Sequence, residues 1–599
     1  MWKINPFNYS RRPTATIQVG ALKIGGNQPI RVQSMTNTDT NDIEASVSQA
    51  IRIIEAGGEL VRFTAQGIRE AENLNFIHHS LREKNYNTPL VADIHFTPNA
   101  ADVAARNVEK VRINPGNYVK SVKKAGDTSD YTDEEFKREY ENIRERFLCL
   151  LAGCKENNTA IRIGVNHGSL SERMMNRYGD TSLGMVESCM EFLKICIEED
   201  FQNVIISMKA SNTVFMVQAV RLLVDRMCKE NILFPLHLGV TEAGDSEDGR
   251  IKSAVGIGAL LVDGIGDTIR VSLSEDPEAE IPVAKQLAEH ITEQKNKQLI
   301  DAKISSLYSP FEYKRRKTTD VKNIGNENVP IVISSACGTY KIQPDYFLQS
   351  DKVVDNAGNE YAIYAHDNLN EADKDTKDLV FLRISYNNLN AELFNYLKER
   401  SNFVVLLNVA TNNPVGEQRA FFHALLNADC ETSVIICRKY HENDLQALQI
   451  KAACDIGVQL IDGFGDGILL ENEGNITSEE VNSIAFGILQ AARVRTTKTE
   501  YISCPSCGRT LFDLQTVIAR IKAATSHLTG LKIGIMGCIV NGPGEMADAD
   551  YGYVGTGRGK VSLYKKKECV EKNIPENEAL DKLIGLIKQN GDWHEDCQT

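Results

Sequence analysis

Short apolar runs recur between residues 30 and 273, and the segments between them have the spacing of amphipathic helices. The runs are PIRVQSM, ELVRFTA, PLVADIHF, EKVRINPG, AIRIGVNHG, NVIISMKAS, PLHLGVTEAG and GDTIRVSLS. Eight strands that alternate with helices over roughly 250 residues are typical of a (β/α)₈ barrel. A doubly wound open sheet would need a glycine-rich turn after the first strand, and PIRVQSM is not followed by one. The pattern therefore predicts an α/β fold that begins with a TIM barrel over residues 1–300.

The composition changes after this barrel. The segment SSLYSPFEYKRRKTTDVKNIGNENVP is charged, rich in Asn and weakly periodic, as linkers are. Further apolar runs follow it, and they are VPIVISSA, KDLVFLRISY, NFVVLLNVA, SVIICRKY and VQLIDGFGDGILL. They predict a second α/β unit, inserted over residues 301–490.

An internal repeat relates the inserted unit to the first barrel. The segment that starts at Ile251 aligns without gaps with the segment that starts at Ile450, 199 residues later. The pairs Asp263 and Asp462, Gly264 and Gly463, Gly266 and Gly465, and Asp267 and Asp466 are identical, whereas Thr268 and Arg270 face Gly467 and Leu469. The residues of the turn are thus the same in both segments, whereas the residues that would contact a ligand differ. We therefore expect a degenerate, barrel-like copy with a structural or spacing role.

Polar side chains stand where the strands of the first barrel end. They are Arg62, Asp93, His95, Arg112, Asn114, Arg162, Asn166, Lys209, Glu242 and Arg270. Catalytic groups of parallel barrels lie at these carboxyl ends, and five cations converging there would repel one another unless an anion were bound. The pattern predicts a diphosphate site. Singly, each Arg also fits a barrel-rim ion pair, Asp93 and His95 fit a hydrogen-bonded pair, and His237 fits an interior histidine.

Three cysteines in the last hundred residues indicate a metal site. Cys504 and Cys507 form a CxxC pair in YISCPSCGR, and Cys538 follows an apolar run 31 residues after Cys507. Structural zinc would need four Cys or His ligands in paired spacings, and the second pair is missing. Cys569 could supply a fourth sulfur, but it stands alone in the polar segment KKKECVEKN. A redox dithiol would leave Cys538 without a role. An iron-sulfur cluster, zinc and a dithiol all remain open on spacing alone.

A nearby carboxylate favours iron. Glu545 follows Cys538 by seven residues across an NGPG turn that could fold it back toward the same centre. An oxygen ligand on thiolate-bound iron exchanges more readily than sulfur and would leave one iron available to a substrate oxygen. Without the cysteines, Glu545 would be read as an ordinary turn carboxylate.

Charge and hydropathy exclude some classes of function. A net charge of -14 argues against general affinity for nucleic acid, although a pocket can be locally basic. No apolar run is long enough for a membrane helix, and the start, MWKINPFNYSRRPTATI, lacks a signal-peptide pattern. We expect a cytoplasmic protein whose cysteines are mostly thiols.

The motifs together resemble a known family. MGCIVNGPGE, with CPSCGR upstream, RINPGN, RIGVNHGSL, SMKASN and GVTEAG, is similar to the 4-hydroxy-3-methylbut-2-enyl diphosphate synthase family. The similarity spans the first barrel and the C-terminal region, and the insertion resembles the three-domain form of plants and some bacteria. The resemblance implies an α+β domain over residues 491–599 that holds a 4Fe-4S cluster. The implied ligands are Cys504, Cys507, Cys538 and Glu545.

The same resemblance implies roles in the barrel. The implied diphosphate ligands are Arg62, Arg112, Arg162, Lys209 and Arg270, with Asn117, Asn166 and Ser272 as weaker candidates. Glu242 is the implied acid or base near the carbon skeleton, and Asp93 is a second candidate. The implied reaction opens 2-C-methyl-D-erythritol 2,4-cyclodiphosphate reductively to (E)-4-hydroxy-3-methylbut-2-enyl diphosphate.

The chain has no complete dinucleotide fingerprint, so the electrons must come from outside, and the family implies a flavodoxin or ferredoxin. In two-domain relatives the cluster domain caps the barrel of a dimer partner. We predict that the insert here places the cluster domain over its own barrel, which leaves a homodimer open. The alternative is a zinc-stabilised TIM-barrel protein that binds or hydrolyses a phosphorylated metabolite. A non-catalytic electron-transfer module would leave the five cations without a purpose.

Overall fold

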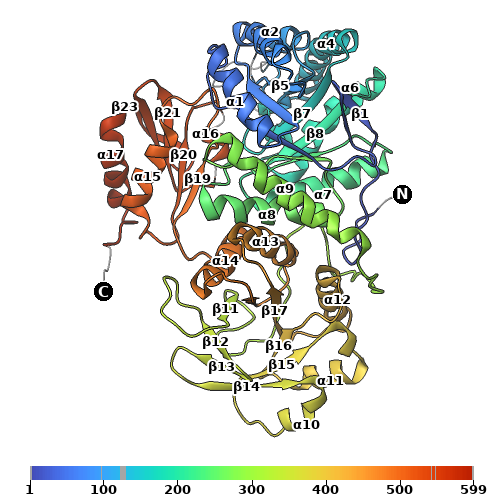
Figure 1. The fold of residues 1–599 in the computed structure, drawn as a ribbon, viewed down its shortest axis with the longest axis vertical. Coiled ribbons are helices and arrows are strands. Elements are labelled where there is room, and N and C mark those ends of the chain that lie inside the picture. Colours follow the sequence, from blue (N-terminus) through green and yellow to red (C-terminus); the bar gives the residue numbers. More distant parts are fainter. Residues whose placement is uncertain are drawn as a thin grey trace.

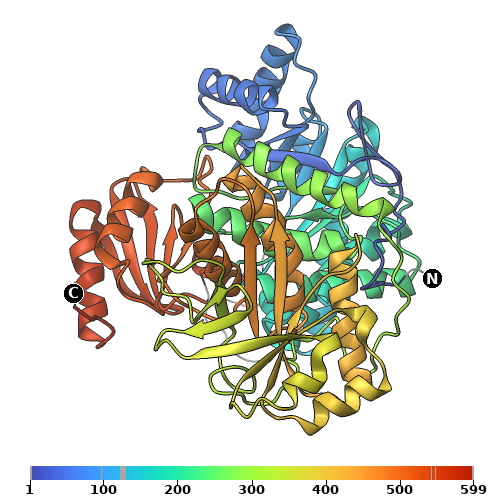
Figure 2. The same cartoon turned by 60° about the horizontal axis from the view of Figure 1, so that its bottom comes forward.

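The computed structural model describes residues 3–95, 97–119, 121, 130–540, 542–546 and 548–595. Three units follow one another along the chain, a first barrel, a second barrel and a five-stranded sheet (Figure 1). Figures 1 and 2 both place the C-terminal sheet to one side of the barrels. Within the described ranges, no helix combines the length and the hydrophobicity that crossing a bilayer requires.

The first barrel contains the eight strands that the apolar runs predict, which confirms the predicted fold class. They are β3 (Arg31–Met35), β4 (Leu60–Thr64), β5 (Leu90–Asp93), β6 (Lys110–Ile113), β7 (Ala160–Asn166), β8 (Val204–Lys209), β9 (His237–Leu238) and β10 (Thr268–Ile269). All pair in parallel in the order β8-β7-β6-β5-β4-β3-β10-β9, and a parallel bridge between Ile206 and Leu236 joins the two ends. Because every strand runs the same way, all their carboxyl ends open at one mouth.

Helices surround this barrel and a hairpin closes its base. The helices are α1 (Ile43–Glu55), α2 (Ile68–Glu83), α3 (Pro98–Ala104), α4 (Asp133–Asn157), α5 (Glu172–Tyr178), α6 (Ser182–Glu198), α7 (Thr213–Lys229), α8 (Ser246–Val262) and α9 (Glu280–Thr292). The hairpin of β1 (Ile17–Val19) and β2 (Leu22–Ile24) packs on the first residues of the strands, among them Leu60, Val91 and Ala160. The end opposite the mouth is therefore sealed by apolar side chains.

The inserted unit is a second closed barrel, turned toward the reader in Figure 2. Its strands are β11 (Ile331–Ser334), β12 (Tyr346–Gln349), β13 (Lys352–Asp355), β14 (Glu360–Ala365), β15 (Val380–Ile384), β16 (Phe403–Leu407), β17 (Ser433–Tyr440) and β18 (Gly467–Asn472). Its helices are α10 (Leu369–Ala372), α11 (Ala391–Glu399), α12 (Pro414–Asn427), α13 (Leu445–Ile461) and α14 (Ser478–Ala491). Strand β13 runs antiparallel to both neighbours, so the copy is barrel-like but irregular, as the repeat predicts.

The repeated segments pack against each other between the two barrels. Helices α8 and α13 carry them, and each contributes a glycine at the same repeat position, Gly258 and Gly457. A Cβ on Gly258 would lie 2.7 Å from Cys454 Sγ, and one on Gly457 would lie 2.8 Å from Val255 Cγ2. Val255 and Cys454 are themselves equivalent positions of the repeat. The helices therefore cross with approximate two-fold symmetry at a distance that only glycine permits.

Four buried charges accompany this crossing. The Arg221 guanidinium lies 2.7 Å from Asp263 and 2.8 Å from Asp462, and Arg419 lies 2.9 Å and 2.7 Å from the same two carboxylates. All four side chains are at most 2% exposed. Each carboxylate caps the helix of one copy of the repeat and pairs with one arginine from each barrel, so the charges are balanced only when both barrels are docked.

The C-terminal unit is a sheet in sequence order. Its elements are β19 (Glu500–Ser503), α15 (Leu514–Thr525), β20 (Lys532–Met536), α16 (Gly542–Glu545), β21 (Tyr551–Gly557), β22 (Lys560–Lys565), β23 (Glu568–Pro575) and α17 (Glu576–Gln589). Strands β19, β20 and β21 are parallel, and β22 and β23 complete the sheet in antiparallel register. Cys504 directly follows β19 and Cys538 lies two residues after β20, so parallel pairing brings both to the same edge.

Replacing Asp462 with Asn tests the buried charges between the barrels. Removing one member of a buried ion-pair network leaves arginines without compensation, so the free energy of unfolding should fall by about 3–5 kcal/mol. The measurement is urea denaturation followed by far-ultraviolet circular dichroism. The control is Glu230→Gln, which breaks the exposed pair with Arg226 and should change the free energy by less than about 0.5 kcal/mol. Equal effects of the two substitutions would contradict the balanced-charge interpretation.

Candidate anion and metal site

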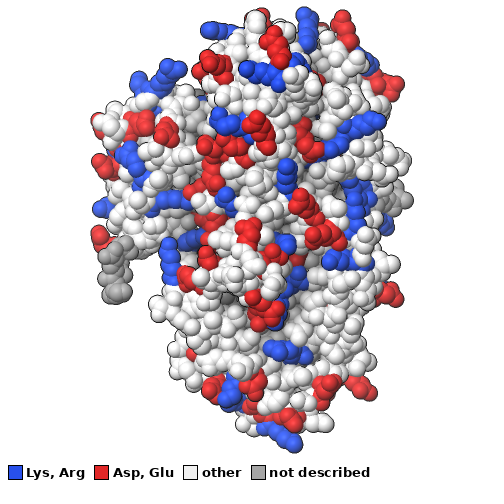
Figure 3. All heavy atoms as spheres, viewed as in Figure 1, with Lys and Arg blue, Asp and Glu red and all other residues white. Residues whose placement is uncertain are grey.

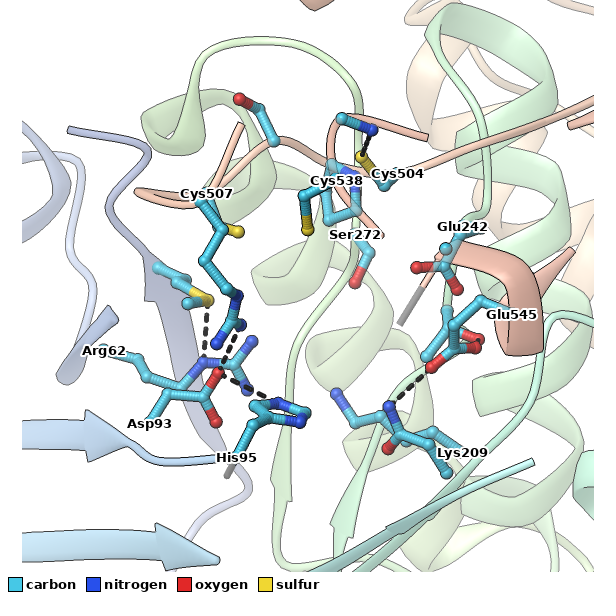
Figure 4. Close-up of a pocket in the computed structure, with 18 of the residues that line it drawn as sticks. Arg62, Asp93, His95, Lys209, Glu242, Ser272, Cys504, Cys507, Cys538 and Glu545 are labelled. Atoms are coloured by element: carbon cyan, nitrogen blue, oxygen red, sulfur yellow. Dashed lines mark hydrogen bonds and ion pairs between the residues drawn. The ribbon is translucent and has the colours of Figure 1, made fainter. Parts of the chain in front are cut away.

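The mouth of the first barrel and the cysteine loops of the C-terminal sheet enclose one pocket (Figure 4). Of the residues that the resemblance assigns to the site, all line it except Asn117, and Asn114, which follows β6, does not line it either. The lining residues among them are Arg62, Asp93, Arg112, Arg162, Asn166, Lys209, Glu242, Arg270, Ser272, Cys504, Cys507, Cys538 and Glu545. All belong to one chain.

Asn117 ends the short helix η1 (Pro115–Asn117) beyond β6. The Asn114 side chain accepts a hydrogen bond from Gly116 N–H and turns the chain there. Asn117 is consequently carried past the strand end and does not reach the pocket lining. Its role in substrate binding stays a prediction.

Three of the five predicted cations have no anionic partner within the described residues. Arg112 pairs with Asp93 and Arg270 pairs with Glu280 at 2.8 Å, but Arg62, Arg162 and Lys209 form no ion pair. Lys209 is 6% exposed and Arg162 is 1% exposed. Burial and the neighbouring cations hold the pKa of both well below its ordinary value. Uncompensated positive charge in a buried mouth is what an anion would neutralise.

The floor beneath these cations is also polar. Lys110 is fully buried and its Nζ donates to Gln33 at 3.3 Å. His237 lies in the barrel interior as predicted, 3.3 Å from Thr268 Oγ1. On the molecular face in Figure 3, acidic and basic side chains are intermingled, so the concentration of positive charge is a property of the pocket rather than of that surface.

Asp93 joins the two halves of the pocket. Its carboxylate accepts from Arg112 Nη1 at 3.0 Å and from Arg509 Nη2 at 2.9 Å. Burial acts to raise the pKa of Asp93, but the surrounding cations hold it well below its ordinary value. Burial and the same arginines lower the pKa of the adjacent His95 to about 3. Asp93 is therefore an ionised counter-ion, which suits it poorly to donating a proton.

Arg509 and Thr241 are site residues that we did not single out in the sequence. Both lie inside quoted motifs, CPSCGR and GVTEAG, next to residues that were chosen. Arg509 meets Asp93 across 416 positions of sequence, and no spacing rule predicts such a contact. The only available signal was a conspicuous cation two residues after a cysteine.

The cysteine loops are fixed by hydrogen bonds of their own. Cys504 Sγ accepts from Gly537 N–H at 3.3 Å, and Ser274 from the barrel donates to the Cys504 carbonyl at 3.1 Å. Cys507 N–H donates to Thr510 Oγ1 at 3.0 Å. Burial raises the pKa of the Cys504 thiol. Cys569 lies away from the pocket on β23, so among the described residues it does not supply the fourth thiol of a structural zinc site.

Glu545 reaches the barrel through a contact between two glycines. A Cβ on Gly168, whose φ is 76°, would lie 2.3 Å from the Gly544 carbonyl oxygen, so only glycine allows these backbones to touch. The Glu545 carboxylate then accepts from Asn166 Nδ2 at 2.5 Å and from Thr241 Oγ1 at 2.8 Å. Glu545 therefore lines the same pocket as the three cysteines, with its carboxylate held by barrel residues and lying beside Glu242 (Figure 4).

Glu242 stands beside Glu545 and has an unusual backbone. Its φ of 48° is in the left-handed region, a conformation that costs free energy for a residue with a side chain. Burial raises the pKa of Glu242, and burial together with Glu242 raises the pKa of Glu545 well above its ordinary value. Two adjacent buried carboxyl groups retain a proton between them. Glu242 is therefore able to donate a proton into the pocket.

A second group of potential ligands, His290, Cys454 and Asp455, lies between the barrels. Asp455 already accepts from His290 at 2.7 Å, from Tyr440 at 2.9 Å and from Arg438. With its carboxylate occupied in this way, the group is part of the packing between α9 and α13.

Comparison with known proteins gives one consistent result. The GcpE TIM-barrel domain matches residues 14–285, and the GcpE protein C-terminal domain matches residues 500–589. A Phocaeicola vulgatus protein named 4-hydroxy-3-methylbut-2-en-1-yl diphosphate synthase (flavodoxin) is 56% identical over 98% of this chain and 99% of its own length. Proteins of the same name from Parabacteroides distasonis and Porphyromonas gingivalis are 57% and 52% identical, each over 98% of this chain and 99% of its own length.

Among solved structures, a Yersinia pestis dihydropteroate synthase matches with a TM-score of 0.31 and 11% identity over 47% of this chain and all of that chain. A similarity this low supports no conclusion.

Replacing Lys209 with Met tests whether the mouth is electrostatically strained without a ligand. Removing one unpaired buried cation should raise the free energy of unfolding of the ligand-free protein by about 1–3 kcal/mol. Urea denaturation in a buffer without phosphate or sulfate measures it. The matched control is Lys252→Met, since Lys252 is equally buried but lies 3.0 Å from Glu500, and this change should destabilise the protein. Destabilisation by both substitutions would show that Lys209 is compensated.

Proposed function

The chain belongs to the family of 4-hydroxy-3-methylbut-2-en-1-yl diphosphate synthases, oxidoreductases of the non-mevalonate route to isoprenoids, and we propose that the pocket at its first barrel's mouth is the active site. The assigned reaction opens 2-C-methyl-D-erythritol 2,4-cyclodiphosphate to (E)-4-hydroxy-3-methylbut-2-enyl diphosphate. Two electrons and one proton enter, the bond from a ring carbon to a phosphate oxygen breaks to leave a free phosphate oxygen, and the proton converts the departing hydroxyl to water. One observation carries this proposal: unpaired buried cations and three cysteines with a carboxylate line the same pocket.

The barrel residues bind and orient the cyclic diphosphate. Among the described residues Arg62, Arg162 and Lys209 form no ion pair, so we assign them as the principal diphosphate ligands. Arg112, Arg270, Asn166 and Ser272 line the same mouth and complete the cradle. As the ring opens, negative charge grows on the phosphate oxygen that leaves carbon, and fixed cations stabilise that charge without reorganising.

The residues of the C-terminal loops fit an iron-sulfur cluster. Cys504, Cys507, Cys538 and Glu545 would hold a 4Fe-4S cluster, and the amide hydrogen bond to Cys504 Sγ is of the kind that accompanies such clusters. When bound there, the cluster supplies electrons one at a time, which matches a two-electron reduction by a one-electron donor. Asn166 and Thr241 hold the Glu545 carboxylate at a defined orientation.

Proton delivery falls to Glu242. It lies beside Glu545 at the pocket wall, and burial keeps its pKa raised, so it can hold a proton for the departing hydroxyl. Asp93, the other predicted acid, acts as the counter-ion of Arg112 and Arg509. The contact of the cysteine loops with the barrel mouth excludes bulk water from the reacting atoms.

The domain roles follow from these assignments. We assign residues 1–300 to substrate binding, residues 301–490 to spacing and support, and residues 491–599 to the cluster. The relatives' name supports a flavodoxin as electron donor, with a ferredoxin as the alternative, and we place the reaction in the cytoplasm. The absence of Cys569 from the pocket disfavours the alternative of a zinc-stabilised barrel that binds or hydrolyses a phosphorylated metabolite.

Metal analysis of protein purified without oxygen tests the cluster. We expect about four irons and four acid-labile sulfides per chain and a brown colour that dithionite bleaches. Cys538→Ala should lose most of the iron and sulfide, whereas Lys209→Ala should keep both and lose affinity for the cyclic diphosphate by at least about tenfold. Zinc without sulfide, persisting after anaerobic reconstitution, would overturn the assignment in favour of the zinc alternative.

Mixing two inactive variants tests whether one chain supplies the whole site. Arg62→Ala inactivates the barrel half, and Cys538→Ala inactivates the cluster half. Because residues of one chain line the pocket, co-expressed mixtures should recover less than about a tenth of the wild-type rate. The control is a mixture of each variant with wild-type chain, which should retain the activity that its wild-type chains contribute. Recovery of substantial activity would mean that the site is shared between chains.

A further inference from the structure

Arg509 has no part in the reaction as proposed above, yet it lines the pocket. It follows Cys507 by two residues, is 8% exposed, and lines the pocket together with Cys507 and Cys538. Its Nη2 lies 2.9 Å from Asp93 Oδ2, so the contact joins the cysteine loop directly to the barrel mouth.

The loop that carries Arg509 is a tight turn. Thr510 N–H donates to the Cys507 carbonyl at 2.8 Å, and Cys507 N–H donates to Thr510 Oγ1 at 3.0 Å. Arg509 therefore leaves a turn of fixed shape, and its side-chain direction is set by the same bonds that orient Cys507. At the far end, the other oxygen of Asp93 accepts from Arg112, which holds the carboxylate in place. A continuous line of contacts thus runs from the cysteine turn to a substrate-binding arginine.

The charge of Arg509 does not vary in this position, since a guanidinium stays protonated throughout the accessible pH range. A reduced cluster carries one more negative charge than an oxidised one. A fixed cation in a dry pocket stabilises that extra charge more strongly than it would in water. Asp93 partly offsets the cation from the opposite side, so the two residues act on the cluster with opposite signs.

We propose that Arg509 is a positioning residue that seats the cysteine loop on the barrel through Asp93 and favours reduction of the cluster by placing a cation beside Cys507 and Cys538. This inference rests on the proposed function, because it assumes the cluster. Loss of a purely structural contact would change the reduction potential equally whichever residue of the ion pair is replaced. Here, replacing Arg509 and replacing Asp93 should change the reduction potential differently.

The test compares Arg509→Gln, Arg509→Lys and Asp93→Asn in the reconstituted holoenzyme, with Arg520→Gln on the exposed face of α15 as control. Redox titration with dithionite, followed by electron paramagnetic resonance, gives the midpoint potential. Arg509→Gln should lower the equilibrium constant for reduction about tenfold, which corresponds to a midpoint potential about 59 mV lower. Arg509→Lys should keep the midpoint potential close to that of the wild type, because the cation is retained. Asp93→Asn should leave the potential equal to or above the wild-type value, and Arg520→Gln should leave it unchanged.

Hydrogen exchange reports the seating of the loop separately. Amides of residues 504–510 should exchange faster in both Arg509→Gln and Asp93→Asn, since each breaks the ion pair, and at the wild-type rate in Arg520→Gln. Loss of potential in Asp93→Asn to the same extent as in Arg509→Gln would overturn the proposal, because it would reduce the pair to a structural contact. So would an unchanged potential in an Arg509→Gln protein with full iron and sulfide.

Loss of the cluster from Arg509→Gln and failure of the proposed function can be distinguished. Where Arg509→Gln fails to retain the cluster, the Asp93→Asn holoenzyme decides, since a potential below wild type contradicts the proposal and one at or above wild type supports it. Failure of the proposed function is recognised earlier, in the wild-type protein, as absence of iron and sulfide or of turnover of the cyclic diphosphate.

Discussion

Uncompensated positive charge at the mouth of the first barrel is the constraint on which the rest of the site depends. Arg62, Arg162 and Lys209 are buried without an anion among the described residues, and burying like charges together is costly. A folded chain can hold them only because the surrounding structure is stable enough to impose the arrangement. The mouth is in this way prepared for a diphosphate before one arrives, and binding relieves the repulsion.

The two-barrel body provides that stability. The crossing of α8 and α13 depends on glycine at equivalent positions of the repeat, and the neighbouring arginines and aspartates are balanced only when both barrels are in contact. The second barrel has lost the cations of the first, with Leu469 where the first has Arg270. Because the second barrel lacks the ligand site, the residues at its strand ends do not need to bind a ligand. This is consistent with a supporting role for residues 301–490.

The site itself is assembled from two units, the first barrel and the C-terminal sheet, and three contacts between them lie at the pocket. The two backbones are in contact at Gly168 and Gly544. The Glu545 carboxylate accepts hydrogen bonds from Asn166 and Thr241, and Asp93 forms an ion pair with Arg509. Each contact pairs a barrel residue with a residue of the cysteine loops. These contacts place the metal ligands over the substrate ligands, so they set the distance between the electron source and the bond to be broken.

The sequence by itself determined the eight strands of the first barrel, the barrel-like copy, the position of the cations at strand ends and the cysteine set. These features are local: hydrophobic period, repeat identity and residue type at a strand end are all written in short stretches of chain. Tertiary structure decided the rest. It moved Asn117 out of the pocket through the η1 turn, made Asp93 a counter-ion by surrounding it with arginines, and brought Arg509 to Asp93 across 416 residues. Charge compensation and the pKa of a buried group depend on what packs around them from distant parts of the chain, and no local pattern contains that information.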